Sequence, residues 1–186
     1  MKLLEERILR DGYILNNDIL KVDSFVNHQI DVKLMRLLAK EIAGTFKADR
    51  VLTIETSGLP IAFAVAEEMG NLPLTFVKKS KSAITGNNLY TTEVKSFTRS
   101  ISSIVTVDKK YIKEGEKVLI VDDFLAEGNA SLGLVDLCKQ AGAVVVGVAV
   151  AIEKGFQGGR SRLEALGIPV YSGANIKAFI DNKPVF

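Results

Sequence analysis

The chain has little of several residue types that commonly carry enzyme chemistry. Among 186 residues there is no tryptophan, one cysteine and one histidine. The single cysteine, Cys138, excludes an intrachain disulfide and fits a reducing compartment. The single histidine, His28, makes a histidine-dependent catalytic triad hard to support, and no Cys/His spacing typical of a zinc site is present.

An excess of charge of one sign and a long hydrophobic run are also absent. The 24 basic and 22 acidic residues leave a net charge of +2, which gives no case for nucleic acid as a bulk partner. The longest apolar run, Ala141–Ile152, contains two glycines and is too short to span a bilayer. The N-terminal residues do not form a signal peptide. We therefore expect one cytoplasmic domain over residues 1–186, with no membrane partner.

Short apolar runs alternate with helical segments along most of the chain. The expected strands are Val51–Ile54, Leu74–Val77, Val118–Val121, Val144–Ala151 and Val170–Ser172. The expected helices run from Asp31 to about Phe46, from Pro60 to about Met69, from Asn129 to Ala141 and from Ser161 to Leu166. This alternation predicts an α/β fold with a parallel sheet covered by helices, whose ligands bind at the carboxyl ends of the strands.

Two regions depart from this alternation. The N-terminal stretch contains two short apolar pieces, Tyr13–Leu15 and Ile19–Val22. The middle stretch, Lys78–Lys117, has weak periodicity, with strand-like alternation only in Tyr90–Val94 and Ile101–Val107. We expect a mobile loop and a β-hairpin there, and a long excursion beside a strand end is a common lid arrangement.

The segment Val118–Ala130 is the most informative part of the sequence. An apolar strand ends in two acids, Asp122 and Asp123, and a turn of small residues around Gly128 then opens a helix. Backbone N–H groups at such a turn can hold a phosphate, and the neighbouring carboxylates can accept hydrogen bonds from ribose hydroxyls. The alternative is that both acids are ordinary surface residues, but the buried strand before them and the turn after them disfavour it.

This segment resembles the ribose-phosphate motif of the type I phosphoribosyltransferases. The family pattern is an apolar strand, two acids, two apolar residues, Ala and a Thr-Gly-Gly-Thr-like loop. Here the loop reads Glu127-Gly-Asn-Ala130, which lacks the usual hydroxyls and places an acid beside the expected phosphate. Backbone donors would still suffice for binding, with the Glu127 side chain directed away.

Further segments resemble the bacterial members of this family that use xanthine. They are Leu20–Asp31, Glu55–Gly58, Lys78–Lys81, Asp122–Ala126 and Ile152–Phe156. The resemblance implies a parallel core sheet over about 31–152, with a small hood formed by parts of about 1–30 and 153–186. It also implies purine salvage by a transferase, in which xanthine and phosphoribosyl diphosphate give xanthosine monophosphate and diphosphate, together with Mg²⁺ and a homodimer.

The resemblance assigns a role to each candidate residue. Asp122 and Asp123 would be catalytic, binding the ribose directly or through a substrate-bound Mg²⁺. The 5′-phosphate would lie on Ala126, Glu127, Gly128, Asn129 and Ala130. The diphosphate would contact Glu55, Thr56, Ser57, Gly58, Lys78, Lys79 and Lys81. The purine would contact Leu20, Asn27, Lys154 and Phe156.

Several of these residues also have an ordinary structural interpretation. Glu55–Gly58 alone reads as a capped helix start, and each lysine reads equally well as part of a solvated loop. Leu20 alone would be assigned to the core, and packing is the commoner fate of a residue such as Phe156. The resemblance to the family is what makes these positions candidate site residues.

Two other functions remain open at this point. The base could be guanine or hypoxanthine, whereas adenine is disfavoured because its 6-amino group would face the Lys154 donor. The chain could also be a purine-responsive regulator that keeps the fold. A regulator acting on nucleic acid would usually have an added DNA-binding region or a strongly basic face, and the sequence shows neither.

Overall fold

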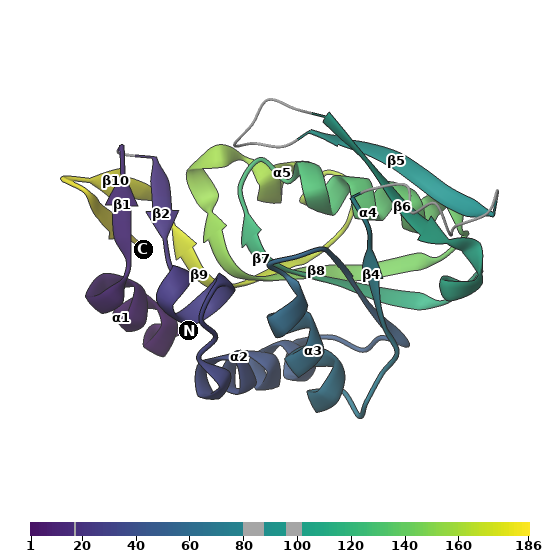
Figure 1. The fold of residues 1–186 in the computed structure, drawn as a ribbon, viewed down its shortest axis with the longest axis horizontal. Helices are drawn as coiled ribbons and strands as arrows, with labels where there is room; N and C mark the ends of the chain where they lie inside the picture. Colours follow the sequence, from purple (N-terminus) through teal and green to yellow (C-terminus); the bar gives the residue numbers. More distant parts are fainter. Residues whose placement is uncertain (17, 80–87, 96–101) are drawn as a thin grey trace.

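A computed structural model describes residues 1–16, 18–79, 88–95 and 102–186 (Figure 1). Lys81 and much of the expected mobile loop lie outside these residues. Five parallel strands form the central sheet in the order β4-β3-β7-β8-β9. Their bounds are β3 Arg50–Ile54, β4 Leu74–Val77, β7 Lys117–Leu125, β8 Val144–Lys154 and β9 Val170–Ile176.

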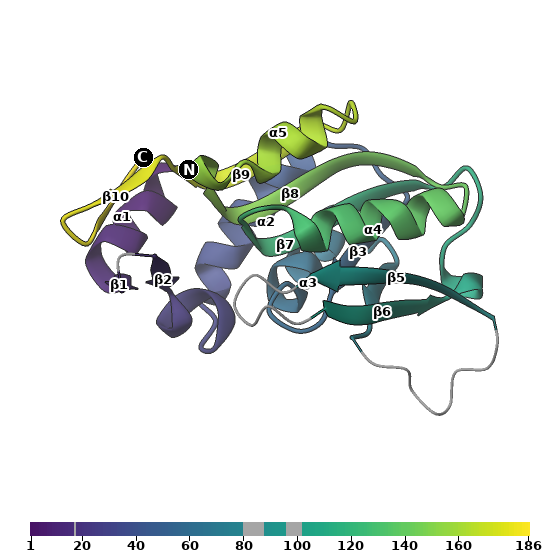
Figure 2. The ribbon, with the colours of Figure 1, turned by 90° about the horizontal axis from the view of Figure 1, so that it is seen from above.

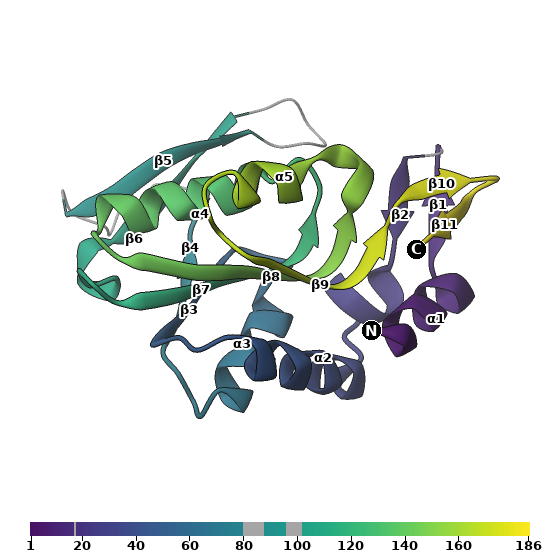
Figure 3. The same ribbon diagram turned by 180° about the vertical axis from the view of Figure 1, so that it is seen from behind.

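Helices cover both faces of this sheet, as Figures 1 and 3 show. On one face lie α2, Val32–Thr45, and α3, Leu59–Glu68. On the other lie α4, Asn129–Gln140, and the short α5, Gly159–Glu164. The predicted parallel α/β fold is therefore confirmed. Within the described ranges, no helix is long and apolar enough to cross a bilayer.

The central strand β7 is buried on both faces, which explains its unbroken apolar run. Leu119 and Val121 pack in the hydrophobic cluster that includes α2 and α3, whereas Val118 and Ile120 pack in the cluster that includes α4. Successive side chains on a strand point to opposite faces, so a strand between two helical layers needs apolar residues at every position. The same alternation continues into the acids at the end of β7.

The middle excursion contains the expected hairpin. Strands β5, Leu89–Lys95, and β6, Ser102–Asp108, pair antiparallel and lie over α4 (Figure 2). Gly133 of α4 permits this approach, since a Cβ there would lie 2.5 Å from a methyl group of Val94. A short 3-10 turn, η2 Lys109–Tyr111, then leads toward β7.

The two ends of the chain lie side by side beyond the carboxyl ends of β8 and β9 (Figure 1). The N-terminal part contains α1 Lys2–Asp11, β1 Tyr13–Leu15, β2 Ile19–Lys21 and the π-helical turn η1 Asp23–Asn27. The C-terminal part contains β10 Ala178–Ile180 and β11 Lys183–Val185. We call these segments the hood. Because β9 belongs to the central sheet, the C-terminal hood segment begins after residue 176.

The start of α2 depends on Asp31. Its Oδ1 accepts a hydrogen bond of 3.0 Å from the backbone N–H of Leu34, and its Oδ2 lies 3.2 Å from Arg7 of α1. One carboxylate therefore caps α2 and links the hood to the core.

We expect Asp31→Ala to lower the free energy of unfolding by about 1 kcal/mol, because the N-cap acceptor is lost. Asp31→Asn is the matched control, since an amide oxygen still caps the helix while the ion pair with Arg7 is lost. Chemical denaturation of both variants measures the two contributions. An equal loss in the two variants would contradict the capping role.

Candidate functional site

Three loops meet at one edge of the sheet because the strands before them are parallel. β3 leads into Glu55–Gly58, β7 ends in the acids and the 126–130 turn, and β8 ends at Lys154. Neighbouring parallel strands end on the same side of a sheet, where α/β proteins bind their ligands. The order β3-β7-β8 therefore brings together three groups of predicted site residues that are far apart in the sequence.

Asp123, in β7, is hydrogen-bonded both to the loop after β3 and to the hood. Its Oδ1 accepts a 3.0 Å hydrogen bond from the Ser57 hydroxyl, and its Oδ2 accepts a 3.1 Å bond from the Asn27 amide nitrogen. Only 6% of Asp123 is exposed. The structure thus places Asn27, which is predicted to contact the purine, beside Asp123, which is predicted to bind the ribose. The Oδ1 of Asn27 is buried and has no hydrogen-bond partner within the described residues.

Asp122 is equally buried but has different surroundings. Its Oδ1 accepts a 2.9 Å hydrogen bond from the backbone N–H of Asp123. A Cβ on Gly58 would lie 2.5 Å from this oxygen and 2.5 Å from the Thr53 hydroxyl oxygen, so only glycine fits there. Burial raises the pKa of Asp122 well above its usual range, and the negative charge of Asp123 raises that pKa further.

The turn at 126–130 has the geometry of a helix-opening loop. Gly128 is the N-cap of α4 with φ of 82°, a conformation that favours glycine. The Oε2 of Glu127 accepts a 3.0 Å hydrogen bond from the Asn129 amide nitrogen, so the two unusual residues of the turn contact each other. Ala126 contributes its carbonyl oxygen, which accepts a 3.0 Å hydrogen bond from the Gly159 N–H of α5.

The loop Glu55–Gly58 contacts the segment after β4. Its first peptide bond, Glu55–Thr56, is cis. The Oε1 of Glu55 accepts a hydrogen bond of 2.5 Å from the backbone N–H of Lys79. Lys78 and Lys79 are both exposed at the end of β4, next to this loop, while Lys81 is outside the described residues. The two described lysines are therefore near the loop but are solvated.

Lys154 lies where β8 meets the hood. It is 7% exposed, and its Nζ donates a 2.7 Å hydrogen bond to the Asp18 carbonyl oxygen. The Nζ also lies 5.7 Å from the ring centroid of Phe179, which packs edge-on against Phe156 at 5.3 Å. Burial lowers the pKa of Lys154, and Asp18 partly offsets this shift. Leu20 is buried in the adjoining hydrophobic cluster.

Several polar residues around the site were not predicted from the sequence. Arg160 binds the buried carboxylate of Glu153 with N–O distances of 2.8 and 2.5 Å. Gln157 and Asn175 have buried side-chain oxygens with no partner in the described part of the chain. Arg162 donates to the 126–130 turn. The sequence beside these residues contains a Gly158-Gly159 pair at the start of α5, but this pair matches no recognised ligand-binding motif.

Residues 21–179 match the family described as phosphoribosyl transferase domain. The chain is 47% identical to xanthine phosphoribosyltransferase 2 of Clostridium botulinum, with all of both chains covered. It is 49% identical to xanthine phosphoribosyltransferase of Clostridioides difficile, covering 98% of that protein.

Solved structures share the fold at lower identity. The adenine phosphoribosyltransferase of Rhodothermus marinus superposes with a TM-score of 0.75 at 20% identity, covering 95% of this chain and 100% of that one. The enzyme of that name from Trypanosoma brucei gives a TM-score of 0.77 at 18% identity, covering 94% of this chain and 78% of that one. At this identity the likeness shows the fold alone.

We expect Asp122→Asn to stabilise the folded protein near neutral pH. The raised pKa of Asp122 means that the unfolded chain loses this proton at a lower pH than the folded protein does. Stability therefore falls as pH rises from the usual carboxyl pKa through the higher folded pKa. Asparagine keeps the oxygen that accepts from Asp123 and removes the titration.

Urea unfolding of the unmodified protein and of Asp122→Asn at several pH values measures this effect. The stability gain of the variant should be smallest in acid and should grow toward neutral pH. A gain that does not change with pH, or a variant less stable at pH 7, would contradict the assignment of burial as the cause.

Proposed function

The chain belongs to the phosphoribosyltransferase family, and on that premise we propose that it transfers the 5-phosphoribosyl group from phosphoribosyl diphosphate to xanthine. The products are xanthosine 5′-monophosphate and diphosphate. The full-length similarity to proteins named xanthine phosphoribosyltransferase supports xanthine as the acceptor base. The observation that carries the reaction is the convergence of the acids, the 126–130 turn and Lys154 at one sheet edge.

The reaction breaks the bond from the anomeric carbon to diphosphate and forms a bond to a purine nitrogen. The ribose gains positive charge as diphosphate leaves, so catalysis needs a fixed sugar, a neutralised leaving group and exclusion of water. Asp122 and Asp123 would bind the ribose hydroxyls. The backbone N–H groups of the 126–130 turn would bind the 5′-phosphate, as helix N-termini bind anions.

The leaving group would be bound by the loop after β3. Backbone amides of Glu55–Gly58 would face the diphosphate, and Lys78 and Lys79 would offset its charge from the neighbouring strand end. Ser57 donates to Asp123, so the diphosphate loop and the ribose acid are in direct contact. Lys81 keeps its predicted role of neutralising the diphosphate.

The base would lie between the hood and the end of β8. An ammonium at Lys154 can donate to the 6-oxo group of a purine, and the Asn27 amide can complement another oxo group or ring nitrogen. Leu20 and Phe156 would contact the ring, with Phe179 supporting Phe156 from its edge. Because Lys154 is largely buried, its hydrogen bond to the base would be shielded from water.

Magnesium fits the donor set at the end of β7. Mg²⁺ prefers oxygen ligands, retains waters and is commonly bound by one or two carboxylates together with substrate phosphates. Asp122 and Asp123 are adjacent carboxylates near the end of β7, so they are the protein groups that would hold it. When bound with the substrate diphosphate, the ion would offset the charge of the leaving group.

An assay with labelled phosphoribosyl diphosphate tests the proposed function. We expect product with xanthine, less with guanine and hypoxanthine, and none with adenine, since Lys154 offers a donor to the position of its amino group. A clear preference for guanine or hypoxanthine would refute xanthine as the acceptor base but would leave the phosphoribosyl transfer itself supported. Absence of product with all four bases would overturn the enzymatic function.

The double variant Asp122→Asn, Asp123→Asn is the negative control for this assay. Turnover should fall by about a thousandfold or more because the groups that hold the ribose lose their charge. Circular dichroism and thermal unfolding should show a folded protein. Full activity in the folded double variant would refute the roles given to the two acids.

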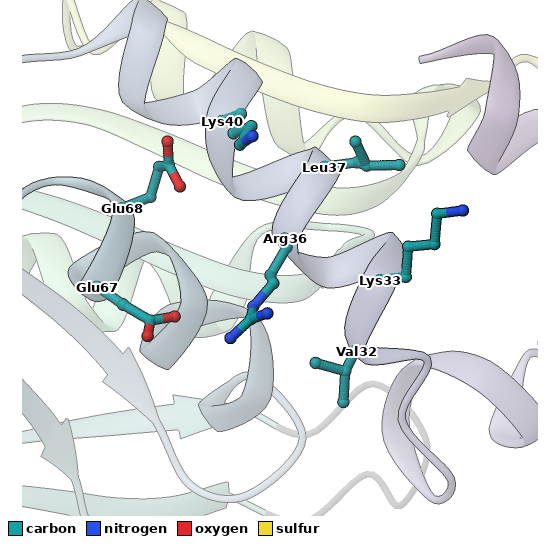
Figure 4. A pocket seen from close by; sticks show the side chains of 7 residues that line it. All are labelled: Val32, Lys33, Arg36, Leu37, Lys40, Glu67 and Glu68. Carbon is teal, nitrogen blue, oxygen red and sulfur yellow. The ribbon is translucent and has the colours of Figure 1, made fainter.

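We also propose that the protein is a homodimer that uses the α2–α3 face. A surface groove of about 550 Å³ lies there, lined by α2 and α3 (Figure 4). On α2 it exposes Lys33, Arg36 and Lys40, and on α3 it exposes Glu67 and Glu68. In a two-fold dimer the same patch meets itself, so a face with adjoining basic and acidic rows is self-complementary.

Apolar side chains beside the groove support the same interface. Phe63 is 64% exposed and lies one helical turn before Glu67, on the same face of α3. Val32 is 59% exposed and lies one turn before Arg36 on α2. Large exposed apolar side chains rimmed by charge are typical of protein interfaces.

We expect Phe63→Asp to shift the protein from dimer to monomer, because a buried unpaired carboxylate would oppose association. Light scattering after size-exclusion chromatography measures the mass in solution. Leu9→Asp, which changes an exposed leucine of α1, is the control and should stay dimeric. A dimeric Phe63→Asp would place the interface elsewhere, and a monomeric unmodified protein would refute the dimer.

A further inference from the structure

The phosphate-binding turn has an unusual pair of side chains. Glu127 places a carboxylate in a turn that would hold a dianion, where like charges repel. Its Oε2 accepts a 3.0 Å hydrogen bond from the amide nitrogen of Asn129. This contact fixes which end of the Asn129 amide faces Glu127, and it leaves the Oδ1 of Asn129 to accept a hydrogen bond from another residue.

Arg162 of α5 supplies that second contact. Its NH1 lies 2.9 Å from the Oδ1 of Asn129 and 2.6 Å from the backbone carbonyl oxygen of Glu127. One guanidinium nitrogen therefore binds a side chain and the backbone of the turn at the same time. The three side chains form a chain from Arg162 through Asn129 to Glu127, with a cation at one end and the acid at the other.

The start of α5 is itself held against the turn. The N–H of Gly159 donates a 3.0 Å hydrogen bond to the Ala126 carbonyl oxygen, and a Cβ on Gly159 would lie 2.3 Å from that oxygen. Arg160 binds Glu153 at the end of β8 and the Val170 carbonyl oxygen of β9, the latter at 2.8 Å. Arg162 therefore acts from a short helix that is fixed to two strands of the central sheet.

We propose that Arg162 is a positioning residue for 5′-phosphate binding, acting through Asn129 and the backbone of Glu127. It holds the turn so that the N–H groups after Glu127 stay directed at the phosphate, and its charge offsets the Glu127 carboxylate. This inference rests on the proposed function. It also explains how a turn without hydroxyl side chains can serve as a phosphate site.

The test compares Arg162→Gln with Arg10→Gln, which removes an exposed arginine whose hydrogen bonds go to Asp11. We expect Arg162→Gln to raise the KM for phosphoribosyl diphosphate about tenfold with kcat nearly unchanged, since a contact used equally before and during reaction affects KM alone. The control should match the unmodified protein.

Binding of xanthosine 5′-monophosphate and of xanthosine separates phosphate positioning from a general structural role. Arg162→Gln should weaken the monophosphate about tenfold and leave the nucleoside unchanged, because the turn loses its charge-assisted hydrogen bonds from Arg162. Equal weakening of both ligands would overturn the proposal, as would an unchanged KM and unchanged affinity for the monophosphate.

A second pair of variants tests the electrostatic part of the proposal, and Arg162→Lys also covers the case in which Arg162→Gln folds poorly. Arg162→Lys keeps the cation and should retain most of the affinity for the monophosphate. The double variant Arg162→Gln, Glu127→Gln should recover part of the loss, because it removes the uncompensated acid. No recovery in the double variant together with full loss in Arg162→Lys would refute the electrostatic role. An unmodified protein inactive with every base would instead refute the proposed function.

Discussion

Two neighbouring carboxylates are buried at the end of β7, and buried charge is costly unless it is paired or hydrogen-bonded. The partners of Asp123 come from the Glu55–Gly58 loop and from the hood, through Ser57 and Asn27. The partner of Asp122 is the backbone N–H of its neighbour. The arrangement of three separate chain segments at this edge therefore depends on satisfying the acids of one strand.

The two acids differ because a strand directs successive side chains to opposite faces. Asp123 accepts hydrogen bonds from the side chains of Ser57 and Asn27. Asp122 lies against Gly58, where no side chain fits, and burial raises its pKa. The stability cost of burying Asp122 is the kind of local disadvantage that proteins retain at functional sites.

The strands of the core could be predicted closely from the sequence because each contains a short apolar run, which in the central strand β7 is buried on both faces. Leu74–Val77 has the predicted bounds, and Val118–Val121 is the centre of a longer strand that also contains the acids. The helix α1 and the hairpin β10–β11 were not predicted, because their packing is decided by distant residues. Leu4 and Ile8, for example, pack in the same cluster as Ala174 and Ile176.

The site residues likewise include some that the local sequence pattern predicted and some that it did not. Local pattern predicted the acids and the turn, which follow the expected strand Val118–Val121, and Lys154, which lies three residues after the expected strand Val144–Ala151. It gave no sign of Arg162, whose contacts with the turn join residues 33 and 35 positions apart. It also did not show that Asn27 binds Asp123, because that contact depends on how the hood folds over the sheet. The role of each residue toward substrate stays a prediction.

The hood joins the first and last segments of the chain around the amine of Lys154, through Asp18 on one side and Phe179 on the other. The proposed base would therefore lie between the two terminal segments and the end of β8, whereas the sugar and its phosphates would bind to the middle of the chain. Under the proposed function, a substitution at Asp18 or Phe179 would act on the acceptor through Lys154, whereas a substitution at Asn27 would also reach Asp123.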